Sequence, residues 1–265
     1  MKKTNYFHIY FVYLKNQLLG IIEYKLDFFI GLLSVFFEQI LSLTFISIIF
    51  LNIQEIAGWS YSDLLLIFSF SILGRSIHII FFDNMWVFGS KYIQKGELDR
   101  LLLRPINPLF QLIAEKINYQ GIGQIIVGSI ALNIALTNLG IEFSVFLLIK
   151  IILLIIISGA VYTGIHLFYM TLSIWVIDSL PIFNTIFALN QFSQYPLNIF
   201  PKFLQFILLF IIPYGFTGFI PSNLFFEESI YTKLLFLSPF FAIALWIINY
   251  QFWIFGLKHY KSTGT

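Results

Sequence analysis

VFLLIKIILLIIISGAVYTGIHLFYMTLSIWVI, residues 145–177, is the most hydrophobic stretch of this sequence, and it decides the fold class. Lys150 is its only charged residue. A helix needs roughly 20 mostly apolar residues to cross the hydrocarbon core of a bilayer. The stretch therefore predicts a transmembrane helix.

The same criterion, applied outward from this stretch, predicts about six crossings in the whole chain. The segment at 117–136 is rich in glycine, and the segment at 181–199 is short and polar, with Asn184, Asn190 and Gln191 inside it. The apolar runs leave no room for a soluble domain, so we predict a single all-α integral membrane domain over residues 1–265. The predicted crossings are residues 26–51, 61–86, 117–136, 145–177, 181–199 and 234–257.

The overall composition agrees with a membrane protein. Hydrophobic residues make up 59% of the chain and charged residues only 11%, whereas about a quarter of the residues in a soluble domain are charged. A net charge of +2 gives no reason to expect nucleic acid as a partner. Because the chain has no cysteine, disulfides, thiol catalysis and cysteine metal sites are excluded.

Residues 200–226 are very apolar but are divided by prolines. Pro201, Pro213 and Pro221 lie within this region, and Pro196 precedes it. Proline removes a backbone donor and kinks a helix, and broken backbone at membrane depth is tolerated only against protein or a water-lined cavity. Two short helices on either side of Pro213, which dip into the bilayer and return, fit this pattern. A single kinked crossing helix is the alternative.

The basic residues indicate which loops face the cytoplasm. Cytoplasmic loops are enriched in Lys and Arg, and these residues gather before the first crossing, between the second and third, and after the last. We therefore predict a multi-pass protein of the cell membrane with both termini in the cytoplasm. The cytoplasmic residues are Lys2, Lys3, Lys15, Lys25, Lys91, Lys95, Arg100, Arg104, Lys116, Lys258 and Lys261; the opposite loops carry Glu55, Asp63, Glu142, Lys202, Glu227, Glu228 and Lys233.

Residues 1–25 are predicted to be a cytoplasmic or interfacial element. Residues 5–18 are apolar and aromatic, with a polar side at His8, Lys15 and Asn16. A helix of this kind can lie flat in the membrane interface, which is the interpretation we favour. Alternatively, it lengthens the first membrane helix.

A short charged helix is predicted within the cytoplasmic loop 88–116, at the sequence GELDRLLLRP. Acidic residues open the segment and arginines close it, as the helix dipole favours. Three leucines share a face at helical spacing, and Pro105 stops the helix. The segment is either a docking surface for a soluble partner or a solvated loop. The predicted docking residues are Gly96, Glu97, Leu98, Asp99, Arg100, Leu101, Leu102, Arg104 and Pro105.

The chain carries no motif for nucleotide binding or catalysis. The phosphate-loop pattern, His-Glu-x-x-His, Gly-x-Ser-x-Gly and the dinucleotide glycine pattern are all missing. The four histidines are scattered. We therefore predict no catalytic residue, no metal site and no cofactor on this chain; if the protein uses ATP, another chain binds it.

Two ionisable residues within the predicted crossings are candidate site residues. Charge inside a membrane is costly and needs a partner. Glu38 falls near the middle of the first crossing and Arg75 near the middle of the second, and consecutive segments are often neighbours. We predict that they pair, either to hold two helices in register or to contact a charged substrate group. His78, almost one turn after Arg75, can join them.

Three segments carry a resemblance to a known family. GELDRLLLRPIN at 96–107 looks like a G-x-L-D-x-x-L-x-R-P motif, YPLNIFP at 195–201 like an aromatic-proline segment, and FIIPYGF at 210–216, with a later Ile220-Pro221, like an apolar stretch with repeated prolines. These motifs, in this order over most of the chain, resemble permeases of the type-2 ABC exporter superfamily. Within it, the chain is most similar to a branch of bacterial permeases of about this length.

The resemblance implies a transmembrane permease in the bacterial inner membrane, with six crossings and a re-entrant helical pair before the last. It implies a coupling helix at residues 97–104, seated in a groove of an ATPase subunit through Leu98, Leu101 and Leu102. It also implies a second permease, identical or related, and two copies of an ABC ATPase that bind ATP and Mg²⁺. Export of a hydrophobic or amphipathic substrate is the expected activity.

Two other classes of function remain open at this point. The same loop could recruit a cytoplasmic protein to a membrane anchor or sensor that transports nothing. A membrane-embedded lipid enzyme is the third possibility, but it would need a cluster of catalytic side chains near an interface, and the sequence offers none.

Overall fold

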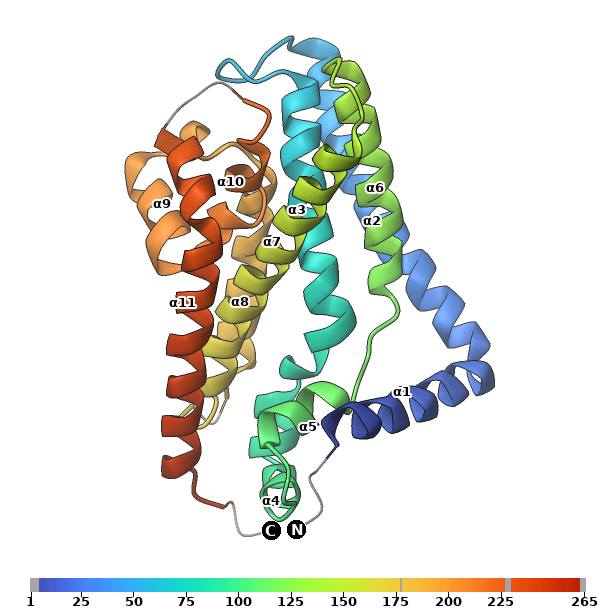
Figure 1. Ribbon diagram of the computed structural model, residues 1–265, viewed down its shortest axis with the longest axis vertical. Coiled ribbons are helices and arrows are strands. Elements are labelled where there is room, and N and C mark those ends of the chain that lie inside the picture. Colours follow the sequence, from blue (N-terminus) through green and yellow to red (C-terminus); the bar gives the residue numbers. More distant parts are fainter. Residues whose placement is uncertain (1–4, 177, 227–229, 263–265) are drawn as a thin grey trace.

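The computed structural model describes residues 5–176, 178–226 and 230–262, and these are almost entirely helical (Figure 1). Within this part of the chain, the only β-type pairing is a single bridge between Ile56 and Trp59. Five charge and boundary assignments made from the sequence lie outside the described residues: Lys2, Lys3, Ile177, Glu227 and Glu228.

Five helices in the described residues are long and apolar enough to cross a membrane. They agree with the predicted crossings to within a few residues at most ends. They are α2 (Lys25–Asn52), α3 (Tyr61–Phe82), α6 (Gly121–Asn138), α7 (Val145–Leu172) and α11 (Ile230–His259). The fourth crossing is shorter than predicted, because α7 ends at Leu172 and the chain continues as turns.

Helix α3 is the central helix of the bundle and packs against α6 and α7. It begins with a capping box, in which the Ser60 side chain and Asp63 exchange hydrogen bonds with each other's backbone. A Cβ added at Gly74 would lie 2.5 Å from the Cβ of Ser158 on α7. The absence of a side chain at Gly74 therefore lets the two helices approach closely.

The predicted fifth crossing is a composite of two helical types. Helix α8 (Leu180–Leu189) tightens into the 3₁₀ helix η3 (Asn190–Gln194), and a short 3₁₀ turn, η4 (Leu197–Ile199), follows. With rises of about 1.5 Å per residue in an α-helix and 2 Å in a 3₁₀ helix, α8 and η3 together span about 25 Å. This composite is thus shorter than the predicted 181–199 segment, and it is not among the five helices that are long and apolar enough to cross a membrane.

A bent helical pair follows, as predicted for residues 200–226. One arm is α9 with the π-helix η5, and the other is η6 with α10; the arms meet at 75° beside Pro213. The chain enters the pair after Asn198, which accepts a hydrogen bond from Trp59, and leaves it at Phe226, whose ring packs on Trp59. Entry and exit thus share one end of the molecule, as the predicted re-entrant pair requires. The four elements are α9 (Lys202–Phe206), η5 (Ile207–Ile211), η6 (Tyr214–Phe216) and α10 (Phe219–Ser222).

The prolines of this region mark its bends. Pro196 precedes η4 and Pro201 caps α9. Pro213 lies at the turn between the two arms, where its missing N–H needs no helical partner. Pro221 lies in the single turn of α10, where short helices tolerate proline.

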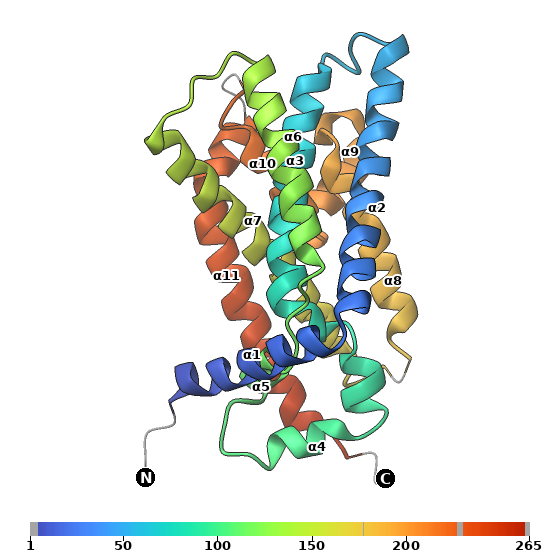
Figure 2. The ribbon, with the colours of Figure 1, turned by 90° about the vertical axis from the view of Figure 1, so that its right-hand side faces the viewer.

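Short helices gather at the end of the bundle where the chain begins. Helix α1 (Tyr6–Glu23) lies across this end, at a steep angle to α2, after a break at Tyr24 (Figure 2). It therefore does not lengthen the first crossing, and none of its residues is buried. Helices α4 (Glu97–Leu102) and α5 (Pro108–Ala114) and the end of α11 lie at the same end (Figure 1).

Candidate functional site

Helix α4 projects from this end of the bundle. The chain reaches it from α3 through the 3₁₀ helix η1 (Asp83–Met85) and the π-helix η2 (Phe88–Ile93). Gly96 has a φ of 70°, a left-handed conformation that glycine adopts without steric cost, and it turns the chain into α4. The helix ends at Leu102, two residues earlier than the predicted Arg104.

The apolar face of α4 points into the protein itself. Leu98 and Leu101 are fully buried in a cluster with Phe88, Tyr92 and Trp253. The prediction that these two leucines seat in a partner's groove is therefore wrong. An amphipathic spacing predicts that one face of a helix is buried, but it does not show whether the same chain or a partner protein buries it. The exposed leucines are Leu102, 42% exposed, and Leu103, 86% exposed.

Charged residues on and near α4 form a network across this end. The Arg100 guanidinium lies 2.9 Å from Glu115 and 3.4 Å from Glu97. Burial alone would lower the pKa of Arg100, but the charge of Glu115 and its hydrogen bond raise it. Arg100 therefore stays charged and oriented. No sequence pattern pointed to Glu115, because it lies 15 residues from Arg100.

Both ends of the chain are tied to this helix. Arg104 donates a hydrogen bond to the Tyr13 hydroxyl of α1 (3.2 Å), and the Ser262 hydroxyl donates one to Asp99 (2.5 Å). Burial and the nearby Asp99 carboxylate raise the pKa of Tyr260 to about 12. The C-terminal residues therefore pack against α4.

The second candidate region lies within the bundle, where the structure brings Glu38 and Arg75 together. Arg75 Nη2 is 3.8 Å from Glu38 Oε1, and the guanidinium also lies over the ring of Phe187, 4.6 Å from its centroid. The Arg75 side chain is only 7% exposed, whereas that of Glu38 is 57% exposed. The carboxylate therefore faces outward from the single chain.

This pair lines a pocket of about 370 Å³ between α2, α3 and the segment formed by α8 and η3. Its polar lining is unusual for a membrane-spanning surface, since unpaired polar groups are costly in hydrocarbon. The amides of Gln191 and Gln194, which the sequence analysis left without a role, belong to this pocket. Its lining residues are Glu38, Leu41, Ser42, Phe45, Arg75, Phe187, Gln191, Gln194 and Tyr195.

A family model described as "ABC-2 family transporter protein" matches residues 36–264. This match takes in α2 from residue 36 onward, the other four long helices, the bent helical pair and α4. The chain belongs to the ABC-2 transporter family. Searches of curated proteins and of solved structures give no match.

Family membership makes the chain the transmembrane permease of an ABC transporter, a transport component that is not itself catalytic. It also implies association with an ABC ATPase. In the described part of the permease, no group of three or more His, Asp or Glu side chains could hold a metal ion.

His78 of the ABC-2 permease packs against α7. Its ring lies 4.4 Å from that of His166, between centroids, and its Nδ1 lies 3.3 Å from the Thr163 hydroxyl. His166 in turn lies 3.3 Å from the hydroxyl of Tyr214, at the tip of the re-entrant pair. These buried contacts hold the tip of the pair against α7 and α3.

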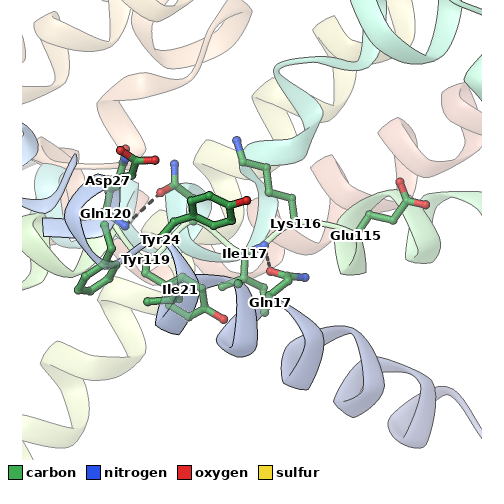
Figure 3. A pocket seen from close by; sticks show the side chains of 12 residues that line it. Gln17, Ile21, Tyr24, Asp27, Glu115, Lys116, Ile117, Tyr119 and Gln120 are labelled. Atoms are coloured by element: carbon green, nitrogen blue, oxygen red, sulfur yellow. Dashed lines mark hydrogen bonds between the residues drawn. The ribbon is translucent and has the colours of Figure 1, made fainter. Parts of the chain in front are cut away.

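A further pocket of the permease, of about 390 Å³, lies where α1 meets α2 (Figure 3). Gln17 closes one side, because its amide donates to Ala114 and accepts from the backbone N–H of Ile117. Lys116 at the rim is paired with Asp83 at 2.7 Å. These contacts fix α1 to the α5–α6 connection.

Proposed function

We propose that this permease exports a hydrophobic or amphipathic substrate across the bacterial inner membrane, driven by two copies of a separate ABC ATPase. The missing phosphate loop supports a separate ATPase, because this motif is what cradles the nucleotide phosphates in ATPases of this kind. ATP and Mg²⁺ bind to that partner. The basic loops support a cytoplasmic location for both termini and for α4.

The observation that carries the proposal is the exposed outer surface of α4. Leu103 is 86% exposed at the end of a short helix whose other face is anchored in the protein core. A protruding leucine beside Glu97 and Arg100 provides the apolar anchor and charged rim that a protein interface needs. The ATPase groove receives this outer surface, and not Leu98 and Leu101.

The test compares Leu103→Asp with Leu51→Asp, an equally exposed leucine (81%) at the opposite end of the bundle. Each variant is co-expressed with an ABC ATPase that co-purifies with the wild-type permease, and the complexes are purified. Leu103→Asp is expected to reduce co-purification and permease-stimulated ATP hydrolysis at least about tenfold. Leu51→Asp should leave both unchanged. Equal ATPase recovery with the two variants would refute docking at α4.

A second permease, identical or related, completes the translocation path in this proposal. Support comes from the pocket at Glu38 and Arg75, which is polar and open on the side of α2. A half-exposed carboxylate facing lipid would be costly. A second permease against α2 shields it and turns two pockets into one path. Cross-linking of single-cysteine variants on α2 tests this arrangement.

Reconstitution separates a transporter from a membrane anchor that only recruits a protein. Proteoliposomes with the permease and ATPase are loaded with fluorescent amphipathic probes. ATP-dependent movement of a probe supports export, and its direction follows from which side gains fluorescence. ATP hydrolysis and probe distribution that are both insensitive to the permease would favour the anchor.

A further inference from the structure

A strained turn lies between α2 and α3, at the end of the molecule opposite to α4 (Figure 1). Ile56 and Trp59 exchange two backbone hydrogen bonds of 3.0 Å around Ala57 and Gly58. Both central residues have positive φ, 51° and 84°, as a type I′ turn requires. Ala57 is the only non-glycine residue with positive φ in the described chain. Backbone strain of this kind persists only where the surrounding structure holds the residue in place, and it is concentrated at functional sites.

The turn fixes Trp59 as one wall of a pocket of about 510 Å³. The Trp59 indole N–H donates to Asn198 Oδ1 at 2.8 Å, so the ring is held from both the backbone and the side chain. Trp59 meets Phe226 at 68° and Phe219 at 77°, and Phe219 meets Tyr231 at 78°. These rings pack edge to face, and Trp59, Phe219, Phe226 and Tyr231 all line the pocket.

The polar part of the pocket is acidic. Asp63 lines it and uses Oδ2 to accept hydrogen bonds from the Ser60 N–H and hydroxyl. Its other oxygen, Oδ1, accepts no hydrogen bond from any residue that the structure describes. No lysine or arginine lines the pocket within the same residues. An anion would therefore find no counter-charge there.

We propose that this pocket binds an organic cation, an alkylammonium group of the choline type. Aromatic faces attract a cation through their negative charge density, and Trp is the strongest of them. The Asp63 carboxylate supplies the opposite charge, while the aromatic walls remove the methyl groups from water. This inference concerns binding by the permease alone and does not rest on the ATPase or on transport.

The first experiment isolates the role of charge. The purified full-length permease in phosphatidylglycerol nanodiscs is titrated with choline and with 3,3-dimethylbutan-1-ol, its uncharged isostere, by isothermal calorimetry and saturation-transfer NMR. Choline is expected to bind at least about tenfold more tightly than the alcohol. Equal binding of the two, or binding of neither, overturns the proposal. Binding of a hexose in place of choline would make the pocket a carbohydrate site and would also overturn it.

The second experiment places the cation in this pocket. Trp59→Leu and Asp63→Asn are each expected to weaken choline binding about tenfold or more, and Phe226→Leu provides a second test of the aromatic wall if Trp59→Leu unfolds. Phe143→Leu, an exposed aromatic outside this pocket, is the control and should bind like the wild type. Unchanged binding by folded pocket variants would refute the location.

A third measurement identifies the source of the cation. The choline titration is repeated in phosphatidylcholine nanodiscs. At high salt, which screens the anionic phosphatidylglycerol surface in the first titration, weaker choline binding in phosphatidylcholine means that lipid headgroups compete for the pocket, so a membrane lipid can occupy it. The same affinity in both lipids means that the pocket takes a free cation from solution. Either result retains the cation site defined by the first two experiments.

Discussion

At the scale of single residues, the pair of Glu38 and Arg75 is asymmetric. Arg75 is buried, and its Nε donates no hydrogen bond to any residue in the described part of the chain, whereas Glu38 is more than half exposed. Sequence reasoning could find this pair because intramembrane charges are rare. It could not find the burial of one partner, because burial depends on Phe187 and on neighbours distant in sequence.

The asymmetry predicts unequal effects of single substitutions. Glu38→Gln leaves a buried guanidinium without its counter-charge, so it should lower thermal stability in detergent more than Arg75→Gln does. The double variant should be more stable than the sum of the single losses predicts, with a coupling energy of about 0.5–3 kcal/mol. Melting temperatures of the wild type, the two single variants and the double variant test this expectation. Fully additive losses would show that the two side chains do not interact.

Gly74 predicts a packing effect at the α3–α7 contact. A methyl group there would lie 2.5 Å from the Ser158 Cβ, and overpacking of this kind costs about 1–3 kcal/mol. Gly74→Ala should therefore lower the melting temperature and the yield of monodisperse protein. Gly20→Ala on α1 is the matched control, because no atom lies within 4 Å of the added methyl group. A stable Gly74→Ala variant would contradict the close approach of the helices.

At the scale of elements, the sequence located every long helix, because a run of apolar residues needs no tertiary information to be recognised. It also located the re-entrant pair from its prolines. It misplaced the end of the fifth crossing, where α8 changes to a 3₁₀ helix at Asn190. It also predicted that a partner protein buries the apolar face of α4, whereas residues from distant segments of this chain bury Leu98.

Helix α4 therefore predicts opposite outcomes for neighbouring leucines. Leu101→Asp buries a carboxylate in an apolar cluster, which costs several kcal/mol without a partner, so folded protein should be nearly absent. Leu103→Asp should give wild-type yield and melting temperature, because its side chain is exposed. Size-exclusion chromatography of detergent-extracted membranes measures the yield of folded protein for each of the two variants. Equal yields would mean that α4 is not anchored as described.

At the scale of the whole molecule, the chain divides into two ends with different chemistry. One end holds α1, α4 and the basic loops, and the other holds the strained turn and both ends of the re-entrant pair (Figure 2). This division could be predicted from charge alone, because Lys and Arg are concentrated in every second loop along the chain. The three-dimensional grouping of the short helices needed the structure.

The absence of cysteine allows a direct test of this division. Single cysteines at Gln54, Lys202 and Ile230 are expected to react with a membrane-impermeant maleimide in intact cells. Cysteines at Leu103 and Lys261 should react only after the membrane is opened. Lys202 and Ile230 flank the re-entrant pair, so labelling of only one of them from outside would mean that the pair crosses the membrane.

The buried anchoring of α4 has a thermodynamic consequence. Leu98 and Leu101 share a cluster with Phe183 of α8, and α8 also carries Phe187, the ring beneath Arg75. Helix α8 thus contributes one ring to the cluster that anchors α4 and another to the Arg75 pocket. Linkage is reciprocal: if ATPase docking alters the affinity of that pocket for a ligand, the ligand alters ATPase affinity by the same factor.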